Sequence, residues 1–133
     1  MRELVEHTGE LELRLRAPTL VELFAEAGRA VADLMIGDNT LGFETVHETV
    51  VVGARDPAAL LVAWIEELIY RAETEDAVFT RFEITALADT ELRATIHGFS
   101  PAVFQSPVKA ATYHRLRLER EGDGYAATVV LDV

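Results

Sequence analysis

The residues most clearly able to do chemistry are oxygen donors at the end of the sequence. Asp132 is followed by Val133, whose main-chain carboxylate adds a second acidic group beside the Asp132 side chain. A hard cation such as Ca²⁺ takes six to eight oxygen ligands, typically from carboxylates and carbonyls. Glu10 adds a third carboxylate if the fold brings it close. Charged residues also commonly mark strand ends and edges, so an Asp132 without a ligand role is the alternative that these residues leave open.

The histidines His7, His47, His97 and His114 are a second set of candidates. No pair of them has the i, i+4 spacing that places two imidazoles on one face of a helix for zinc. His7 lies close to Glu10 in the sequence, and this pair could serve a metal-dependent hydrolase in which a bound ion activates water. Histidines on the surface or hydrogen-bonded at strand ends are the alternative.

A third set lies in the segment 108–114, where Lys109 and Tyr113 would share one face of a strand and His114 the other. Tyrosine and lysine together can serve dehydrogenase chemistry, but that chemistry needs a glycine-rich nucleotide loop, and the sequence contains none. The segment is therefore interpreted as a strand with one core face and one solvent face.

Bulk composition excludes several classes of protein. The 133 residues fit a single domain, residues 1–133, and half of them are apolar, which is enough for a core. There are 12 basic and 23 acidic residues, for a formal net charge of −11, so direct nucleic-acid binding is not expected. The absence of cysteine excludes disulfides and thiolate chemistry. Without a signal core or an apolar run of ~20 residues, we expect a cytoplasmic protein without membrane contact.

Alternation of apolar and polar residues predicts the strands that must position these groups. In the segment 10–16, Leu11, Leu13 and Leu15 would face inward. Further segments that alternate or are rich in valine and threonine predict strands at 43–52, 78–87, 91–97, 108–119 and 125–133.

Two amphipathic helices are predicted between the strands. Thr19 has Glu22 three residues later, which is the spacing of a capping box, and Gly37 ends the helical pattern. Asp56 followed by Pro57 predicts the start of the second helix, which we expect to end near residue 73. The predicted fold is α+β, with two helices packed on largely antiparallel β-sheet in the approximate order ββαβαββββ, in which one strand precedes the segment 10–16.

Motifs spread over nearly the whole sequence resemble those of one protein family. Residues 7–10 resemble its His-Thr-Ala-Asp motif, and residues 23–27 match its first helix. Residues 60–70 resemble Leu-Leu-Val-Asp-Trp-Leu-Asn-Glu-Leu-Leu-Tyr, and residues 108–116 resemble Val-Lys-Ala-Val-Thr-Tyr-His-x-Leu. Residues 129–133 resemble Val-Val-Leu-Asp-Ile. On these segments the chain resembles archease.

The resemblance implies an α+β fold and a non-enzymatic protein that activates the RNA ligase of tRNA splicing and RNA repair. That ligase joins 2′,3′-cyclic-phosphate or 3′-phosphate ends to 5′-hydroxyl ends with GTP and Mn²⁺, and archease promotes its guanylation and multiple turnover. The metal of archease itself is typically Ca²⁺. Carried over by motif, its ligands are Glu10, Asp132 and Val133.

The resemblance also implies residues that support these ligands or contact the partner. They are His7, Thr8, Lys109 and His114, which belong to the matching motifs. We expect the partner to be a ligase with a basic surface, because complementary charge speeds the encounter of two proteins. Two alternatives are a metal-dependent hydrolase and a metal-stabilised interaction module without a ligase partner.

The sequence departs from the family pattern at three places. Glu10 stands where the family has Asp, which moves the carboxylate one methylene further from the backbone. Ala63 and Glu66 stand in place of an Asp and an Asn in the second helix. The loop at 99–107 is short and lacks the charged, histidine-containing pattern common before Val-Lys-Ala.

Overall fold

The computed structural model describes residues 1–7, 9–39, 42–104 and 108–133. Within these residues the elements follow the predicted order of two strands, a helix, a strand, a helix and four strands. They are β1 Arg2–His7, β2 Glu10–Ala17, α1 Leu20–Ile36, β3 Val46–Gly53, α2 Pro57–Glu75, β4 Val78–Leu87, β5 Glu91–Phe99, β6 Ala110–Glu121 and β7 Gly124–Asp132.

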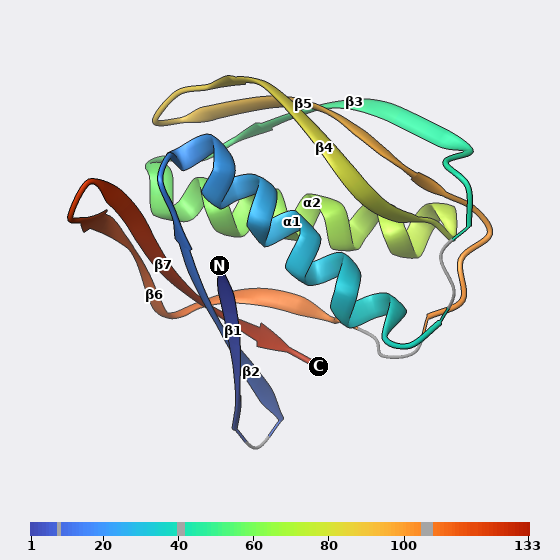
Figure 1. The fold of residues 1–133 in the computed structure, drawn as a ribbon, viewed down its shortest axis with the longest axis horizontal. Helices are drawn as coiled ribbons and strands as arrows, with labels where there is room; N and C mark the ends of the chain where they lie inside the picture. Colours follow the sequence, from blue (N-terminus) through green and yellow to red (C-terminus); the bar gives the residue numbers. More distant parts are fainter. Residues whose placement is uncertain (8, 40–41, 105–107) are drawn as a thin grey trace.

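Two antiparallel sheets enclose a middle layer that contains α1 and α2 (Figure 1). The first sheet has the strand order β1-β2-β7-β6, and the second has the order β3-β5-β4. The α+β class and the packing of the helices on antiparallel sheet are therefore as predicted, with the strands divided between two sheets. In the first sheet, β2 and β7 are the central strands, so segments from the two ends of the sequence lie side by side.

Both helices begin at the predicted residues. The Thr19 hydroxyl accepts a hydrogen bond from the backbone N–H of Glu22 at 3.1 Å, and the Asp56 carboxylate accepts one from Ala59 at 2.8 Å. Gly37 caps the end of α1 with a φ of 60°, a conformation that glycine adopts without steric cost. Neither α1 nor α2 is long and apolar enough to cross a membrane.

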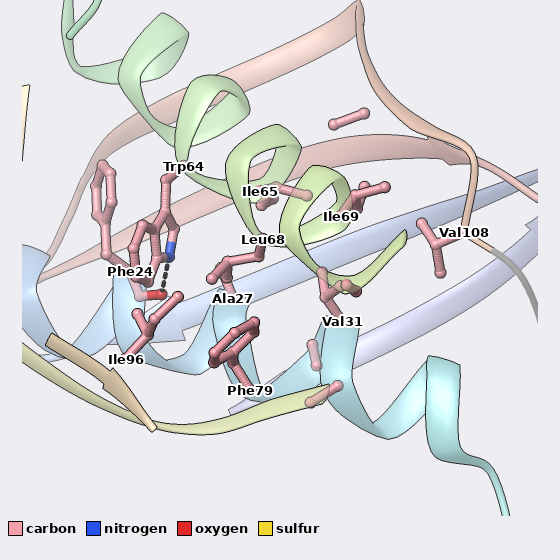
Figure 2. Packing of buried hydrophobic residues seen from close by; sticks show 14 of the residues in the cluster. Phe24, Ala27, Val31, Trp64, Ile65, Leu68, Ile69, Phe79, Ile96 and Val108 are labelled. Atoms are coloured by element: carbon pink, nitrogen blue, oxygen red, sulfur yellow. Dashed lines mark hydrogen bonds between the residues drawn. The ribbon is translucent and has the colours of Figure 1, made fainter. Parts of the chain in front are cut away.

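The core lies between the helices and the inner faces of the two sheets (Figure 2). Trp64 of α2 is fully buried, and its indole N–H donates a hydrogen bond to the backbone carbonyl of Phe24 in α1 at 2.8 Å. The Trp64 ring also meets the ring of Phe82 edge-on, with 5.7 Å between their centroids. This residue therefore joins both helices to the second sheet.

The first sheet carries one large irregularity, which corrects the regular alternation of faces predicted for residues 109–114. Between Thr112 and Arg117, β6 advances by five residues while β7 advances by two, from Val130 to Thr128. The extra residues form a bulge, and Arg115 within it has a φ of 56°. Bulges re-aim side chains that regular pairing would place elsewhere. The prediction that Tyr113 and His114 lie on opposite faces of a regular strand is therefore wrong, because regular pairing stops at Thr112.

Candidate metal site at the end of the four-stranded sheet

Glu10 and Asp132 are direct partners in the antiparallel pairing of β2 with β7. Residues opposite each other in such a pair point to the same face, with their Cβ atoms ~4.5–5.5 Å apart. Val133 follows Asp132 directly, so its main-chain oxygens lie at the same edge of the sheet. The fold thus brings together the three residues carried over from the family motifs, although metal binding by them stays a prediction.

Two of the four predicted supporting residues flank this pair. His7 of β1 is the direct partner of Glu10, and Ala110 of β6 is the direct partner of Asp132, so all four lie in one row across the sheet. The backbone N–H of Lys109 donates to the carbonyl of Asp132 at 2.9 Å, while the Lys109 side chain is exposed. His7 therefore faces the candidate site, and Lys109 fixes its backbone.

The other two predicted supporting residues are placed differently. Thr8 lies outside the described residues. His114 lies in the bulge of β6, where its side chain is exposed and its backbone N–H donates to the Thr112 hydroxyl at 3.3 Å. The pairing of β6 with β7 is interrupted at this position, so regular strand geometry does not place the His114 side chain in the row of Glu10 and Asp132.

The structure adds a residue that the sequence reasoning missed. The guanidinium of Arg115 lies 3.3 Å from a carboxylate oxygen of Glu10 and 3.6 Å from one of Glu12. Nothing in the sequence marks this position, because Arg115 sits in a segment that reads as a regular strand and the bulge contains no glycine. The candidate site therefore has a fixed cation of its own beside one of its ligands.

Glu12, the second partner of Arg115, is buried. It also accepts a hydrogen bond from Nε of Arg14 at 2.7 Å. The hydrogen bond from Arg14 holds the pKa of the Glu12 carboxyl below its ordinary value, against the opposing effect of burial. The positive charge of Arg115 adds to this lowering. Glu12 is thus a carboxylate anchored by two arginines, on the outer face of the sheet where the sequence pattern predicts an exposed residue.

The position of the strand that carries Arg115 is fixed in turn by α2. The Glu66 carboxylate accepts a hydrogen bond from the backbone N–H of Ala111 at 3.0 Å. Glu66 is one of the departures from the family motif, and its longer side chain here holds the start of β6 against the helix. The substitution therefore has a structural role next to the candidate site.

The donors at the candidate site fit a hard cation in their chemistry. They are the carboxylates of Glu10 and Asp132 and the main-chain oxygens at Val133, which are ligand types that Ca²⁺ accepts. Among the residues that the structure describes, no three His, Cys, Asp or Glu side chains come together as a metal-binding group. Main-chain oxygens and water would therefore have to complete the coordination of a cation here.

An apolar groove of about 520 Å³ opens beside Val133 on the inner side of the same strand ends. Figure 1 shows why: the ends of β1 and β2 nearest their connection project away from both helices, which leaves this part of the sheet uncovered. Leu4 is 43% exposed there, and Leu11, expected to be buried, is only partly covered. The groove is lined by Leu4, Glu6, Leu11, Leu34, Val108 and Val133.

A larger groove of about 700 Å³ follows the outer face of the same sheet and contains four arginines. Each of them is paired with a carboxylate: Arg16 with Glu121 and Arg117 with Glu119, and the other two with the glutamates described above. The positive charges of the groove are therefore already compensated by neighbouring carboxylates.

The remaining histidines lie on the other sheet. His47 and His97 are direct partners in β3 and β5, with their ring centroids 6.0 Å apart. Nε2 of His97 lies 3.3 Å from a carboxylate oxygen of Glu83, without the alignment of a hydrogen bond. They do not join the row at Glu10, so among the described histidines only His7 lies in that row.

Comparison with known sequences matches residues 3–133 to the model of the Archease protein family. Protein archease of Methanosarcina acetivorans is 32% identical, over 98% of this chain and 94% of that protein. Protein archease of Methanopyrus kandleri is 33% identical, over 98% of each.

Two solved structures share the fold. The solution structure of protein 1598 of Methanobacterium thermoautotrophicum has a TM-score of 0.78 at 24% identity, over 99% of this chain and 98% of that chain. The crystal structure of "an archease, possible chaperone" of Thermotoga maritima has a TM-score of 0.72 at 21% identity, over 100% of this chain and 98% of that chain. The likeness to these structures extends over the whole arrangement of helices and sheets.

Proposed function

This chain belongs to the archease family, and from this premise we propose that it activates an RNA ligase by promoting ligase guanylation and multiple turnover. Proteins of this family are activators or chaperones rather than catalytic enzymes, as predicted for this chain. Family membership thus favours an activator over the alternative of a metal-dependent hydrolase built on His7 and Glu10. The ligase acts in tRNA splicing or RNA repair, and we place the activator with it in the cytoplasm.

The observation that carries the proposal is the pairing of Glu10 with Asp132 beside Val133. It gathers acidic groups from both ends of the sequence at one edge of the first sheet. Glu10, Asp132 and the main-chain oxygens of Val133 would hold a hard cation there, with Ca²⁺ as the expected ion. A cation bound there would link the ends of β2 and β7 through these residues, which lie on paired strands.

The apolar groove beside Val133 supplies a second contact for the same partner. It lies on the other side of the same strand ends, lined by Leu4, Leu11 and Val108. Interfaces commonly combine an apolar centre with a polar rim, and here the acidic site forms that rim. We propose that an apolar segment of the ligase, flanked by basic residues, occupies this groove. The net charge of −11 favours such a partner over nucleic acid.

The proposal is tested by the guanylation of a cognate ligase with GTP, measured with and without this protein. We expect a higher rate of guanylation with the wild-type protein and none of this gain with Asp132→Lys, which reverses the charge at the site. Asp89→Lys is the matched control, because Asp89 lies exposed in the β4–β5 turn of the other sheet. An unchanged guanylation rate with wild-type protein would contradict activation. A protein that binds a ligand at this site without changing the ligase would instead be an interaction module.

A further inference from the structure

We infer that Arg115 is an internal counter-ion that competes with a divalent cation for Glu10 and thereby sets the cation affinity of this chain. The inference rests on the proposed cation site and names a residue that tunes it. Its basis is a contact: an arginine Nη lies 3.3 Å from the carboxylate of Glu10, the carboxylate that faces Asp132 across β2 and β7.

The bulge of β6 is what aims Arg115 at this site. Regular pairing resumes at Arg117, opposite Thr128 of β7, so the intervening residues are looped out between two fixed points. Arg115 takes a φ of 56° there, a conformation that residues with a Cβ adopt at a steric cost. The neighbouring Arg117 on the same strand is instead paired with Glu119. The contact with Glu10 is thus particular to Arg115.

Electrostatics make the guanidinium and a metal ion alternatives at Glu10. A divalent cation on Glu10 and Asp132 would lie within a few ångströms of the Arg115 charge and be repelled by it. The ion pair itself is open to solvent, with 43% of the Arg115 side chain and 34% of the Glu10 side chain exposed, so it is weak enough to exchange.

Arg115 has a second partner to which it can turn. Its Nε lies 3.6 Å from Glu12, which Arg14 already holds by a hydrogen bond. Release of Glu10 therefore leaves the guanidinium beside a buried carboxylate instead of unpaired. This arrangement predicts a cation affinity that is lowered by Arg115 without being abolished.

The test is isothermal titration calorimetry with CaCl₂ on the wild-type protein and on Arg115→Gln. We expect Arg115→Gln to bind Ca²⁺ about tenfold more tightly, since a repelling charge is removed close to the ion. Arg115→Gly is a second variant, because glycine suits the positive φ at this position and so preserves the fold. Arg117→Gln is the matched control on the same strand, and its Ca²⁺ affinity should equal that of the wild type. In the double variant Glu10→Gln/Arg115→Gln the gain should disappear.

The outcomes separate this inference from the proposal on which it rests. Stronger binding in both Arg115 variants supports the counter-ion role, including a result in which binding by the wild type is too weak for the titration to detect. Equal binding by the wild type and both Arg115 variants overturns that role and leaves the cation site in place, as does weaker binding in these variants. No Ca²⁺ binding by any of these proteins overturns both the inference and the cation site.

Discussion

Glu10 of β2 lies directly opposite Asp132 of β7, so two carboxylates from opposite ends of the sequence share one face of the first sheet. Like charges placed directly opposite destabilise an antiparallel pair. Here Arg115 lies beside the Glu10 carboxylate and offsets part of the repulsion between the two acidic groups. A bound cation would offset it further, and this relationship leads to the first prediction.

Ca²⁺ should stabilise the folded protein through Asp132. At a free concentration one hundred times the Kd, a ligand of the folded state adds ~2.7 kcal/mol, and each kcal/mol raises the unfolding midpoint of a chain of this size by about 3–5 °C. We expect Asp132→Asn to lose this shift in thermal unfolding with CaCl₂ and with EDTA. Asp89→Asn, in the exposed β4–β5 turn, should keep it. Equal shifts in both variants would place the cation elsewhere.

Leu4 should contribute to docking and little to stability. It lines the apolar groove and is 43% exposed, so Leu4→Ser removes contact area for a partner while the core stays intact. We expect the affinity for the ligase, measured by surface plasmon resonance, to fall by about tenfold, with unfolding changed by under ~1 kcal/mol. Val51→Ser alters a residue of similar exposure on the other sheet and should leave the affinity unchanged. A ligase affinity that Leu4→Ser leaves intact would exclude the groove as the contact.

Trp64 should be the most sensitive position in the helix layer. Trp64→Phe removes the donor to the Phe24 carbonyl and leaves a space in the core, which together cost about 1–3 kcal/mol. Tyr70→Phe changes an aromatic residue of the same helix that is 60% exposed, and it should cost less than ~0.5 kcal/mol. Denaturant unfolding monitored by far-UV circular dichroism separates the two. A loss as small for Trp64→Phe as for Tyr70→Phe would contradict the packing described.

Glu12 should make the protein sensitive to acid. Its pKa is lower in the folded protein than in the unfolded chain, mainly because of the hydrogen bond from Arg14, so the unfolded chain takes up more protons between the two values. The stabilisation is complete above the ordinary Glu pKa of ~4.3 and is lost as the pH falls through the lowered value. We expect urea unfolding between pH 6 and pH 3 to show a smaller loss of stability for Glu12→Gln than for wild type. Glu119→Gln removes an exposed ion pair and should retain the wild-type pH dependence.

Local signals in the sequence were enough to predict both helices and the strands after β1. The N-caps at Thr19 and Asp56 and the helical end at Gly37 depend on neighbouring residues alone, and the structure confirms all three. Alternation in β2 likewise predicts that Leu13 and Leu15 are buried. The proximity of Glu10 and Asp132 could not be derived from local patterns, because it depends on which strands pair. The family resemblance implied it, and the register places the two residues opposite each other.

Features set by tertiary contacts escaped the sequence reasoning. The division of the strands between two sheets depends on how both faces of the helix layer are covered, which alternation within one strand does not encode. The bulge in β6 arises without a glycine, so the strand pattern gave no sign that Arg115 is turned toward Glu10. The burial of Glu12 follows from the arginines that surround it, contributed by two strands far apart in the sequence.

The central claim is that this chain activates an RNA ligase through the edge of the sheet at Asp132. It is tested most directly by multiple-turnover ligation, with RNA substrate in excess over a cognate ligase and this protein added in wild-type, Asp132→Lys or Asp89→Lys form. Activation predicts many ligation events per ligase molecule with the wild type and with Asp89→Lys, and about a single event with Asp132→Lys. A number of turnovers that is the same with the wild-type protein as without it would contradict the claim.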